Sequence, residues 1–140
     1  MTHDYPVPRP SPVNQGHLDA WRDEGKLLLQ ECRACCRISY YPRPFCPHCF
    51  ADAPIWIQAA GIAEIVLATR IHRPNHPSFF EQVPIVLAEL KLPEGPTMLA
   101  RIVGEDRENA MERALVRLVA PPGHKAFPLP TFVLYDGGDD

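Results

Sequence analysis

The sequence of 140 residues lacks the common signatures of enzymes and membrane proteins. No apolar run approaches the ~20 residues of a membrane-spanning helix, so we expect no membrane segment. A Walker phosphate loop, a dinucleotide glycine fingerprint, an H-E-x-x-H motif and a G-x-S-x-G elbow are all missing. Lysine is scarce and the net charge is −3, which disfavours general binding of nucleic-acid phosphates. Residues 1–6 show no basic-then-apolar secretory signal, so we expect a cytoplasmic protein.

Proline, by contrast, is abundant, with 17 residues in the chain. Because proline fixes φ and donates no backbone hydrogen bond, it favours short strands, turns and fixed loops over long helices. Hydrophobic residues make up 46% of the chain, enough for a globular core. The length suits one ordinary domain, or a small metal module with one compact barrel.

Four of the five cysteines form two C-x-x-C pairs separated by ten residues: Cys32, Cys35, Cys46 and Cys49. Two residues between cysteines let one tight turn aim both thiolates at the same point. Two such turns supply the four sulfurs of a closed tetrahedral zinc site. The spacing therefore predicts a structural zinc with no open position for a substrate. Iron also binds tetrahedral sulfur sites and stays an alternative, whereas disulfides need an oxidising compartment.

Each C-x-x-C turn is followed by a residue other than the glycine that often stands there. We expect positive φ at Cys36 and Phe50, which costs on the order of 1 kcal/mol for a residue with a side chain. We also expect Cys36 to be a small buried filler, with a substitute metal ligand after a slip in register as the alternative. His48 is predicted to be an exposed spacer, since four sulfurs already complete the site.

The amino-terminal part predicts one helix before the cysteines. Residues 1–13 form a proline-punctuated arm, and Asn14 is a candidate N-cap for a helix that ends at Gly25. Leu18 and Trp21 share one face of this helix, which we expect to pack on the ribbon or on a partner protein. A strand is predicted over residues 26–31, and a short connection over residues 53–57.

From Gly61 onward the pattern is that of a small β-barrel. Apolar Ala63, Ile65, Leu67, Thr69 and Ile71 alternate with polar residues, which predicts a half-buried strand. Further strands are predicted over residues 84–92, 97–104, 115–120 and 131–135. A short helix, capped by Asp106 and reaching about Arg113, lies between the third and fourth strands. Five strands with a short helix at this place is the order of an OB-fold barrel.

The sequence thus predicts a mainly β protein of the small α+β class. We expect an arm and amino-terminal helix over residues 1–25, a zinc ribbon over residues 26–52, and a five-stranded OB-fold barrel over residues 60–136.

The combined pattern resembles an acyl-CoA-associated family with a rubredoxin-like zinc ribbon followed by an OB-fold, catalogued as domain of unknown function thirty-five. The resemblance spans about Val13 to Leu134. It is carried by Trp21, Gly25-Lys26-Leu27, Cys32-Arg33-Ala34-Cys35, Tyr41-Pro42-Arg43, Cys46-Pro47-His48-Cys49, Gly61 and Pro84-Ile85-Val86-Leu87-Ala88. The chain departs from the family in lacking a glycine after each C-x-x-C turn, or knuckle, and a Gly-x-Pro before the fourth barrel strand.

The resemblance implies a non-catalytic accessory subunit. Members of the family are similar in pairing with thiolases, with thiolase-like aldolases of the lipid-transfer type, or with hydroxymethylglutaryl-CoA synthases. The expected partner is therefore a thiolase-fold enzyme in a hetero-oligomer, whose acyl-CoA channel this subunit would line in part. The expected cofactor is a structural zinc, with a CoA thioester as a ligand shared with the partner and no catalytic residue in this chain.

The loop of residues 70–80 joins the first two predicted barrel strands, on a usual ligand-facing edge of OB-folds. Its arginines are suited to CoA phosphates and its phenylalanines to a partner or to pantetheine. Alternatively, the two phenylalanines close the end of the barrel, and His72 and His76 are solvated. With the helix tryptophan, the candidate contact residues are Arg70, His72, Arg73, Phe79, Phe80 and Trp21. Stacking aromatics and cations leave single-stranded nucleic-acid binding as the rival function, although the acidic balance disfavours it.

Overall fold

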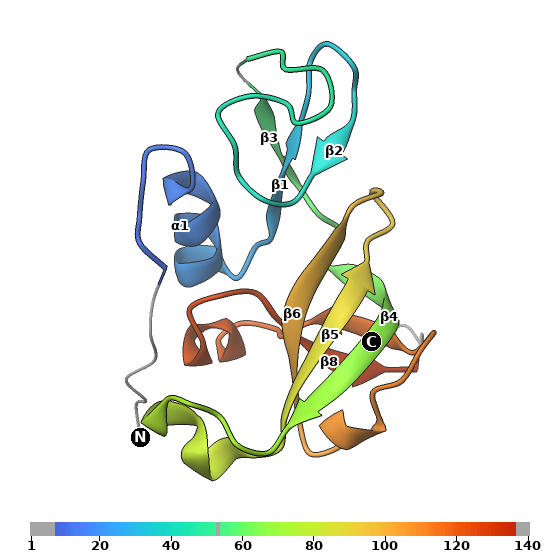
Figure 1. Cartoon of the computed structure of the whole chain (residues 1–140). Helices are drawn as coiled ribbons and strands as arrows, with labels where there is room; N and C mark the ends of the chain where they lie inside the picture. The colour runs from blue at the N-terminus through green and yellow to red at the C-terminus, as the bar shows by residue number, and fades with distance from the viewer. Residues whose placement is uncertain (1–7, 53, 137–140) are drawn as a thin grey trace.

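A computed structural model describes residues 8–52 and 54–136 of the chain. Figure 1 shows a small sheet at one end of the molecule, a barrel at the other, and a helix beside them. This is the mainly β architecture that the sequence predicts. Among the described residues, no helix has the length and apolar character needed to cross a membrane.

Helix α1 spans Gln15–Glu24 and ends as predicted at Gly25. Gly25 adopts left-handed backbone with φ 68°, and its N–H donates to the Trp21 carbonyl oxygen at 3.0 Å. Asn14 occupies the N-cap position, but its side chain makes no capping bond to the helix. Its Oδ1 instead accepts from the Ser11 N–H at 2.7 Å. The predicted side-chain cap is therefore wrong, because the preceding turn uses the amide.

The small sheet has the strand order β2-β1-β3 and is antiparallel throughout. Strand β1 (Leu28–Glu31) lies in the centre, between β2 (Ile38–Ser39) and β3 (Ile55–Gln58). The prediction of a mere connection over residues 53–57 is wrong, because β3 pairs with all four residues of β1. The ribbon sheet therefore includes a strand beyond residue 52.

The five remaining strands close into a barrel in the order β4-β5-β6-β8-β7. They are β4 (Ile62–Ile71), β5 (Ile85–Lys91), β6 (Thr97–Val103), β7 (Leu115–Leu118) and β8 (Thr131–Tyr135). Strand β4 pairs with both β5 and β7, which closes the barrel, and β6 runs parallel to β8. The predicted five-stranded OB-fold is confirmed.

The alternation predicted for the first barrel strand holds only in its first half. Ala63 and Ile65 are buried, but the register shifts between Ile65 and Leu67, and Leu67 and Thr69 are exposed. A bulge of this kind bends a strand and reverses the faces of the residues that follow. The prediction that Leu67 and Thr69 share the buried face with Ile65 is therefore wrong.

Short 3-10 helices connect the barrel strands. The sequence predicts a helix from Asp106 to about Arg113, but the structure has only one 3-10 turn there, η2 (Arg107–Asn109). The Asp106 side chain makes no capping bond. Two further turns, η1 (Pro77–Gln82) and η3 (Gly123–Ala126), lie in the β4–β5 and β7–β8 connections.

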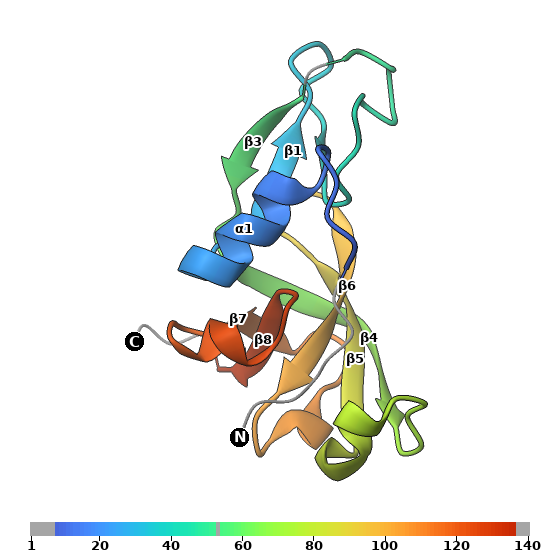
Figure 2. The same ribbon diagram turned by 90° about the vertical axis from the view of Figure 1, so that its left-hand side faces the viewer.

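Helix α1 packs between the ribbon and the carboxyl-terminal part of the barrel domain (Figure 2). The ring of His17 contacts the ribbon, where Nδ1 lies 3.1 Å from the Leu28 carbonyl oxygen. On the barrel side, Trp21 meets the ring of His124 edge-on. Leu27 and Leu29 belong to the same buried cluster as the barrel residues, so one hydrophobic core serves both parts.

Candidate metal centre and binding cleft

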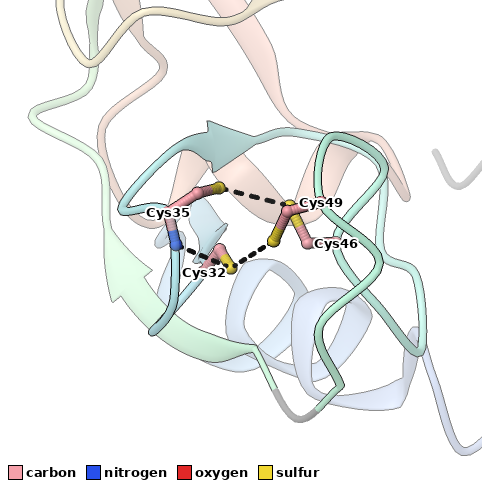
Figure 3. Close-up of side chains that lie close together, drawn as sticks. All are labelled: Cys32, Cys35, Cys46 and Cys49. Atoms are coloured by element: carbon pink, nitrogen blue, oxygen red, sulfur yellow. Dashed lines mark hydrogen bonds between the residues drawn. The ribbon is translucent and has the colours of Figure 1, made fainter.

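The four predicted cysteine ligands converge at the tip of the ribbon (Figure 3). Their sulfur atoms all lie within 4.8 Å of one another, with 3.5 Å between Cys32 and Cys49 and 3.7 Å between Cys35 and Cys46. Tetrahedral coordination with metal–sulfur bonds of about 2.3 Å places sulfurs roughly 3.8 Å apart. Disulfide sulfurs would lie about 2.05 Å apart, so these cysteines are thiols positioned for a metal ion.

Each knuckle is a tight turn whose backbone N–H groups point at a sulfur. Cys32 Sγ accepts from the N–H groups of Ala34 at 3.3 Å and Cys35 at 3.4 Å. Cys46 Sγ accepts from the His48 N–H at 3.3 Å. Such bonds stabilise thiolates, which are the form that binds metal. The turns therefore prepare the sulfurs for coordination.

The pKa values of the thiols follow from this geometry. The N–H group of Cys35 is the main cause that lowers the pKa of Cys32 to about 6. For Cys46, burial opposes ionisation, but the N–H groups of Cys49 and His48 outweigh it and lower the pKa. The Arg37 N–H favours the Cys35 thiolate, yet desolvation and the neighbouring thiols raise the pKa of Cys35 to about 12. The cluster thus ionises stepwise, and a bound cation would favour the remaining thiolates.

The residues that follow the two knuckles have the expected positive φ, but one of them differs from the prediction in its burial. Cys36 has φ 64° and Phe50 has φ 65°, as predicted. Cys36 is exposed and lies outside the four-cysteine cluster, so the prediction of a buried filler is wrong. His48 is exposed as predicted, and its Nδ1 lies 3.2 Å from the Arg37 guanidinium.

A buried glutamine fixes the chain between the two knuckles. The Gln30 side chain donates from Nε2 to the Arg43 carbonyl oxygen at 3.1 Å and accepts at Oε1 from the Arg43 N–H at 2.8 Å. A side-chain amide thereby replaces the pair of bonds that a neighbouring strand would make. It holds the proline-rich return against β1 without further secondary structure.

A cleft of about 480 Å³ opens on the outer face of the barrel. Its floor is formed by β5 and β6, and its walls come from the β4–β5 connection and from the segment that follows η3. In OB-folds these correspond to the second and third strands and to the two loops that most often bind ligands. Mostly apolar side chains line the cleft, with Arg101 as its buried charged member.

The six predicted contact residues do not all lie at the cleft. Arg73 and Phe79 line the cleft, whereas His72 and Phe80 are exposed outside its lining. The Arg70 guanidinium is turned away and donates to the carbonyl oxygens of Glu108 and Ala110 in the η2 segment. Of the predicted contact residues in this loop, Arg73 and Phe79 are therefore the two that line the cleft.

Trp21 does not lie at this surface. It is 1% exposed, and its Nε1 donates to the Phe127 carbonyl oxygen at 2.9 Å. The prediction of direct contact with a partner is therefore wrong for Trp21 in this structure, because the indole is enclosed between α1 and the η3 segment.

One of the two histidines in this loop, His76, has a structural partner. His76 is half-buried, and its Nδ1 lies 3.2 Å from the Ser78 N–H and 2.7 Å from Ser78 Oγ at the start of η1. The expectation of a solvated residue fits exposed His72 but not His76. The His76–Ser78 pair caps η1, and none of the described carboxylates bonds to the imidazole as in a hydrolytic triad.

Sequence reasoning identified Arg73 but missed Arg101, the buried charged residue of the cleft. The Arg101 guanidinium carbon lies 5.6 Å from the Phe79 ring centroid and 5.4 Å from that of Phe127. A single arginine in an alternating strand carries no distinguishing signal. The aromatic partners come from opposite ends of the barrel sequence, so only the fold brings them together.

Two family models match consecutive parts of the chain. The ChsH2 rubredoxin-like zinc ribbon domain matches residues 22–54, and the ChsH2 carboxyl-terminal OB-fold domain matches residues 56–121. Together these matches cover more than half of the chain, and they coincide with the ribbon and with most of the barrel.

Known proteins show the same combination. The chain is 28% identical to a chain of an Ltp2–ChsH2(DUF35) aldolase structure, with a TM-score of 0.73, covering 91% of this chain and 98% of that one. A DUF35-family crystal structure of unknown function from Sulfolobus solfataricus shares the fold, at 18% identity and TM-score 0.65, covering 89% of this chain and 87% of that one.

A curated relative is the probable enoyl-CoA hydratase alpha subunit of Thermomonospora curvata, 32% identical over 99 residues. The match covers 69% of this chain but only 30% of that relative. From the two consecutive domain matches and the shared fold, the chain belongs to the ChsH2 (DUF35) family, which joins a rubredoxin-like zinc ribbon to an OB-fold domain.

Proposed function

We propose that the protein is a non-catalytic accessory subunit of an acyl-CoA enzyme of the thiolase-like or aldolase type. The observation that carries the proposal is the likeness, over nearly its whole length, to a chain of the Ltp2–ChsH2(DUF35) aldolase. The relative described as an enoyl-CoA hydratase subunit supports the same area of metabolism. A closed four-cysteine centre fits a supporting role, because it leaves no open coordination position for a substrate.

The metal in this proposal is a structural zinc held by Cys32, Cys35, Cys46 and Cys49. A zinc ion would supply no reaction chemistry here and would instead link the two knuckles. Because β1 and β3 of the ribbon also carry part of the common core, the metal supports the barrel as well as the ribbon.

The proposed partner surface is the outer face of the β4–β5–β6 sheet. Leu67 and Leu99 are 54% and 59% exposed, and both lie beside Glu89 in the sheet. Exposed Phe80 and His72 lie in the adjoining connection, and Arg73 and Phe79 face the cleft. Adjacent exposed apolar side chains on a sheet are typical of protein interfaces. An acyl-CoA shared with the partner would contact this surface at Arg73 and Phe79.

Affinity purification of the tagged chain from its native source tests the proposal. We expect an acyl-CoA enzyme of the thiolase fold to co-purify in a fixed ratio, identified by mass spectrometry. The double variant Leu67→Ser with Leu99→Ser should lose the enzyme and keep its metal. A matched variant on the opposite barrel strand, Arg117→Ser, should retain it.

Recovery of nucleic acid without an acyl-CoA enzyme would contradict the proposal and favour the rival single-stranded nucleic-acid function. The purified chain alone should show no thiolase, aldolase, hydratase or hydrolase turnover with acyl-CoA substrates. Turnover that a single substitution in this chain abolishes would show that the subunit is itself catalytic.

A further inference from the structure

Arg101 is a buried, positively charged residue with no acidic partner among residues 8–52 and 54–136. It lies in β6, opposite Leu87 of β5 and Thr131 of β8. Its neighbours Ala100 and Ile102 face the core, so the Arg101 side chain leaves the opposite face, toward the cleft. Although it lies on the outer face, it is only 8% exposed, because η1 and the segment after η3 cover it.

The contacts of Arg101 within the described residues leave its charge uncompensated. Its Nη2 donates to Gln82 Oε1 at 2.7 Å, and its plane lies near the rings of Phe79 and Phe127. Its Nε is buried and has no hydrogen-bond partner in the described part of the chain. None of the described carboxylates lies within ion-pair distance of the guanidinium. Cation–π contacts offset part of the desolvation of a buried cation, but an unused N–H donor still costs free energy.

The unused donor and the Gln82 contact lie on the same edge of the guanidinium. Nε and Nη2 form the side-on pair of donors that a carboxylate can accept with its two oxygens. A neutral amide oxygen from Gln82 now uses one of these donors. A carboxylate that replaces this oxygen would satisfy both donors and neutralise the charge.

The cleft beside Arg101 suits an apolar chain. Ile85 and Leu87 of β5 and Leu99 of β6 form its floor, and Leu129 and Pro130 form part of one wall. Its volume of about 480 Å³ lies within the usual range of small-molecule sites, roughly 300–1,000 Å³. A mostly apolar lining with a few polar or charged groups, here buried Arg101 and exposed Arg73, is the usual composition of such a site.

We propose that this cleft binds an amphiphilic carboxylate, with the carboxylate on Nε and Nη2 of Arg101 and the alkyl chain on Leu87 and Leu99. Gln82 acts as a neutral placeholder that the ligand displaces. Neither the metal nor a partner enzyme contacts the ligand in this proposal, which goes beyond the accessory role and can fail independently of it.

Isothermal titration of the whole isolated chain with decanoate, below the concentration at which it forms micelles, tests the proposal. We expect saturable binding of one decanoate per chain. Methyl decanoate keeps the alkyl chain but lacks the charge, and acetate keeps the charge but lacks the chain. Each should bind at least about tenfold more weakly than decanoate, because charge-assisted bonds and apolar burial each contribute on this scale. Equal binding of methyl decanoate would overturn the assignment of Arg101 as the anchor.

Two variants separate the ligand contact from folding. Arg101→Met should weaken decanoate binding by about tenfold or more through loss of the charge-assisted bonds. Gln82→Glu keeps Arg101 and nearly the same side-chain shape, but places a carboxylate beside the guanidinium within the chain. It should weaken binding by a similar factor while the thermal midpoint stays equal or rises. Arg117→Met is the control, since that arginine lies over the Tyr135 ring outside the cleft.

Unchanged decanoate affinity in Gln82→Glu would contradict the proposal, because an internal carboxylate must compete for the same donors. Absence of saturable binding to the unaltered chain would contradict it as well. Both results leave the co-purification test of the accessory role unaffected.

Discussion

The indole Nε1 of Trp21 donates a hydrogen bond of 2.9 Å to the carbonyl oxygen of Phe127, which lies 106 residues later in the chain. This bond joins the amino-terminal helix to the last connection of the barrel. It also places the helix beside the segment whose phenylalanine ring covers Arg101. The helix is therefore part of the barrel domain's structure and not a free docking arm.

Replacement of Trp21 by Phe should lower the free energy of unfolding by about 1–3 kcal/mol, because the Phe127 carbonyl oxygen loses its buried donor. Metal content should stay the same. Urea denaturation checks the change, and Trp56→Phe is the control, since Trp56 is partly exposed and should cost less. Equal losses in the two variants would show that the hydrogen bond contributes little.

Replacement of Cys46 by Ser should reduce the bound metal well below one ion per chain and lower the thermal midpoint. Cys46 supplies one of the four converging sulfurs, and a structural site contributes its binding free energy to folding. Cys36→Ser is a matched control, because Cys36 is exposed and lies outside the cluster. Elemental analysis after purification without added metal measures the content and distinguishes zinc from iron. Less than about a third of a metal ion per unaltered chain would contradict the closed site.

Acidification should release the metal, and the apparent metal affinity should fall more steeply with decreasing pH below about pH 6. In the metal-free chain the pKa of Cys32 lies at about 6, below its ordinary value of 9.0, so Cys32 is mostly a thiolate at neutral pH. Below that pKa, metal binding must displace about one proton more. Because folding lowers the pKa of Cys32, its thiolate also stabilises the metal-free fold. This contribution is fully present above the ordinary pKa of 9.0 and is lost as the pH falls through the folded value of about 6. Competition with a chromophoric chelator across pH measures the slope, and a constant slope from pH 5 to 8 would contradict the assignment.

Replacement of Gly25 by Ala should destabilise the chain by about 1–3 kcal/mol, because left-handed backbone and a new contact oppose the methyl group. An added Cβ would lie 3.0 Å from His124 Cγ and 3.2 Å from Pro121 Cγ. Gly25→Asn separates the two causes, since asparagine tolerates this backbone better but still carries the Cβ. Equal stability of the Asn variant and the unaltered chain, measured by thermal denaturation, would show that the contact with His124 is harmless.

Local sequence patterns correctly predicted the features of the fold that depend on interactions between residues close together in the sequence. The C-x-x-C spacing defines where the thiolates point, and the period-two pattern of Val86, Ala88, Leu90 and Leu92 identifies a buried face. The end of α1 at Gly25 follows from one residue's tolerance of positive φ. Each of these signals lies within a few residues of the structure that it predicts.

Features that depend on distant pairing could not be predicted in the same way. Strand β3 is short and follows a proline, so only its pairing with β1 identifies it. The bulge after Ile65 depends on register with β5, and no local residue type marks it. Arg101 is buried through contacts with Gln82, Phe79 and Phe127. These residues lie far from Arg101 in the sequence, so only the tertiary fold brings them together. The cleft thus emerged only from the tertiary structure.

The position of α1 has a consequence for how the molecule unfolds. His17 packs on the ribbon, Trp21 packs on the barrel, and Leu27 and Leu29 continue the barrel core into the ribbon sheet. Neither part can open without exposing apolar surface of the other, so calorimetry should record a single cooperative transition. Chelation at the ribbon tip should then lower the midpoint of that transition as a whole, and hydrogen exchange should quicken in the distant strands β5 and β6.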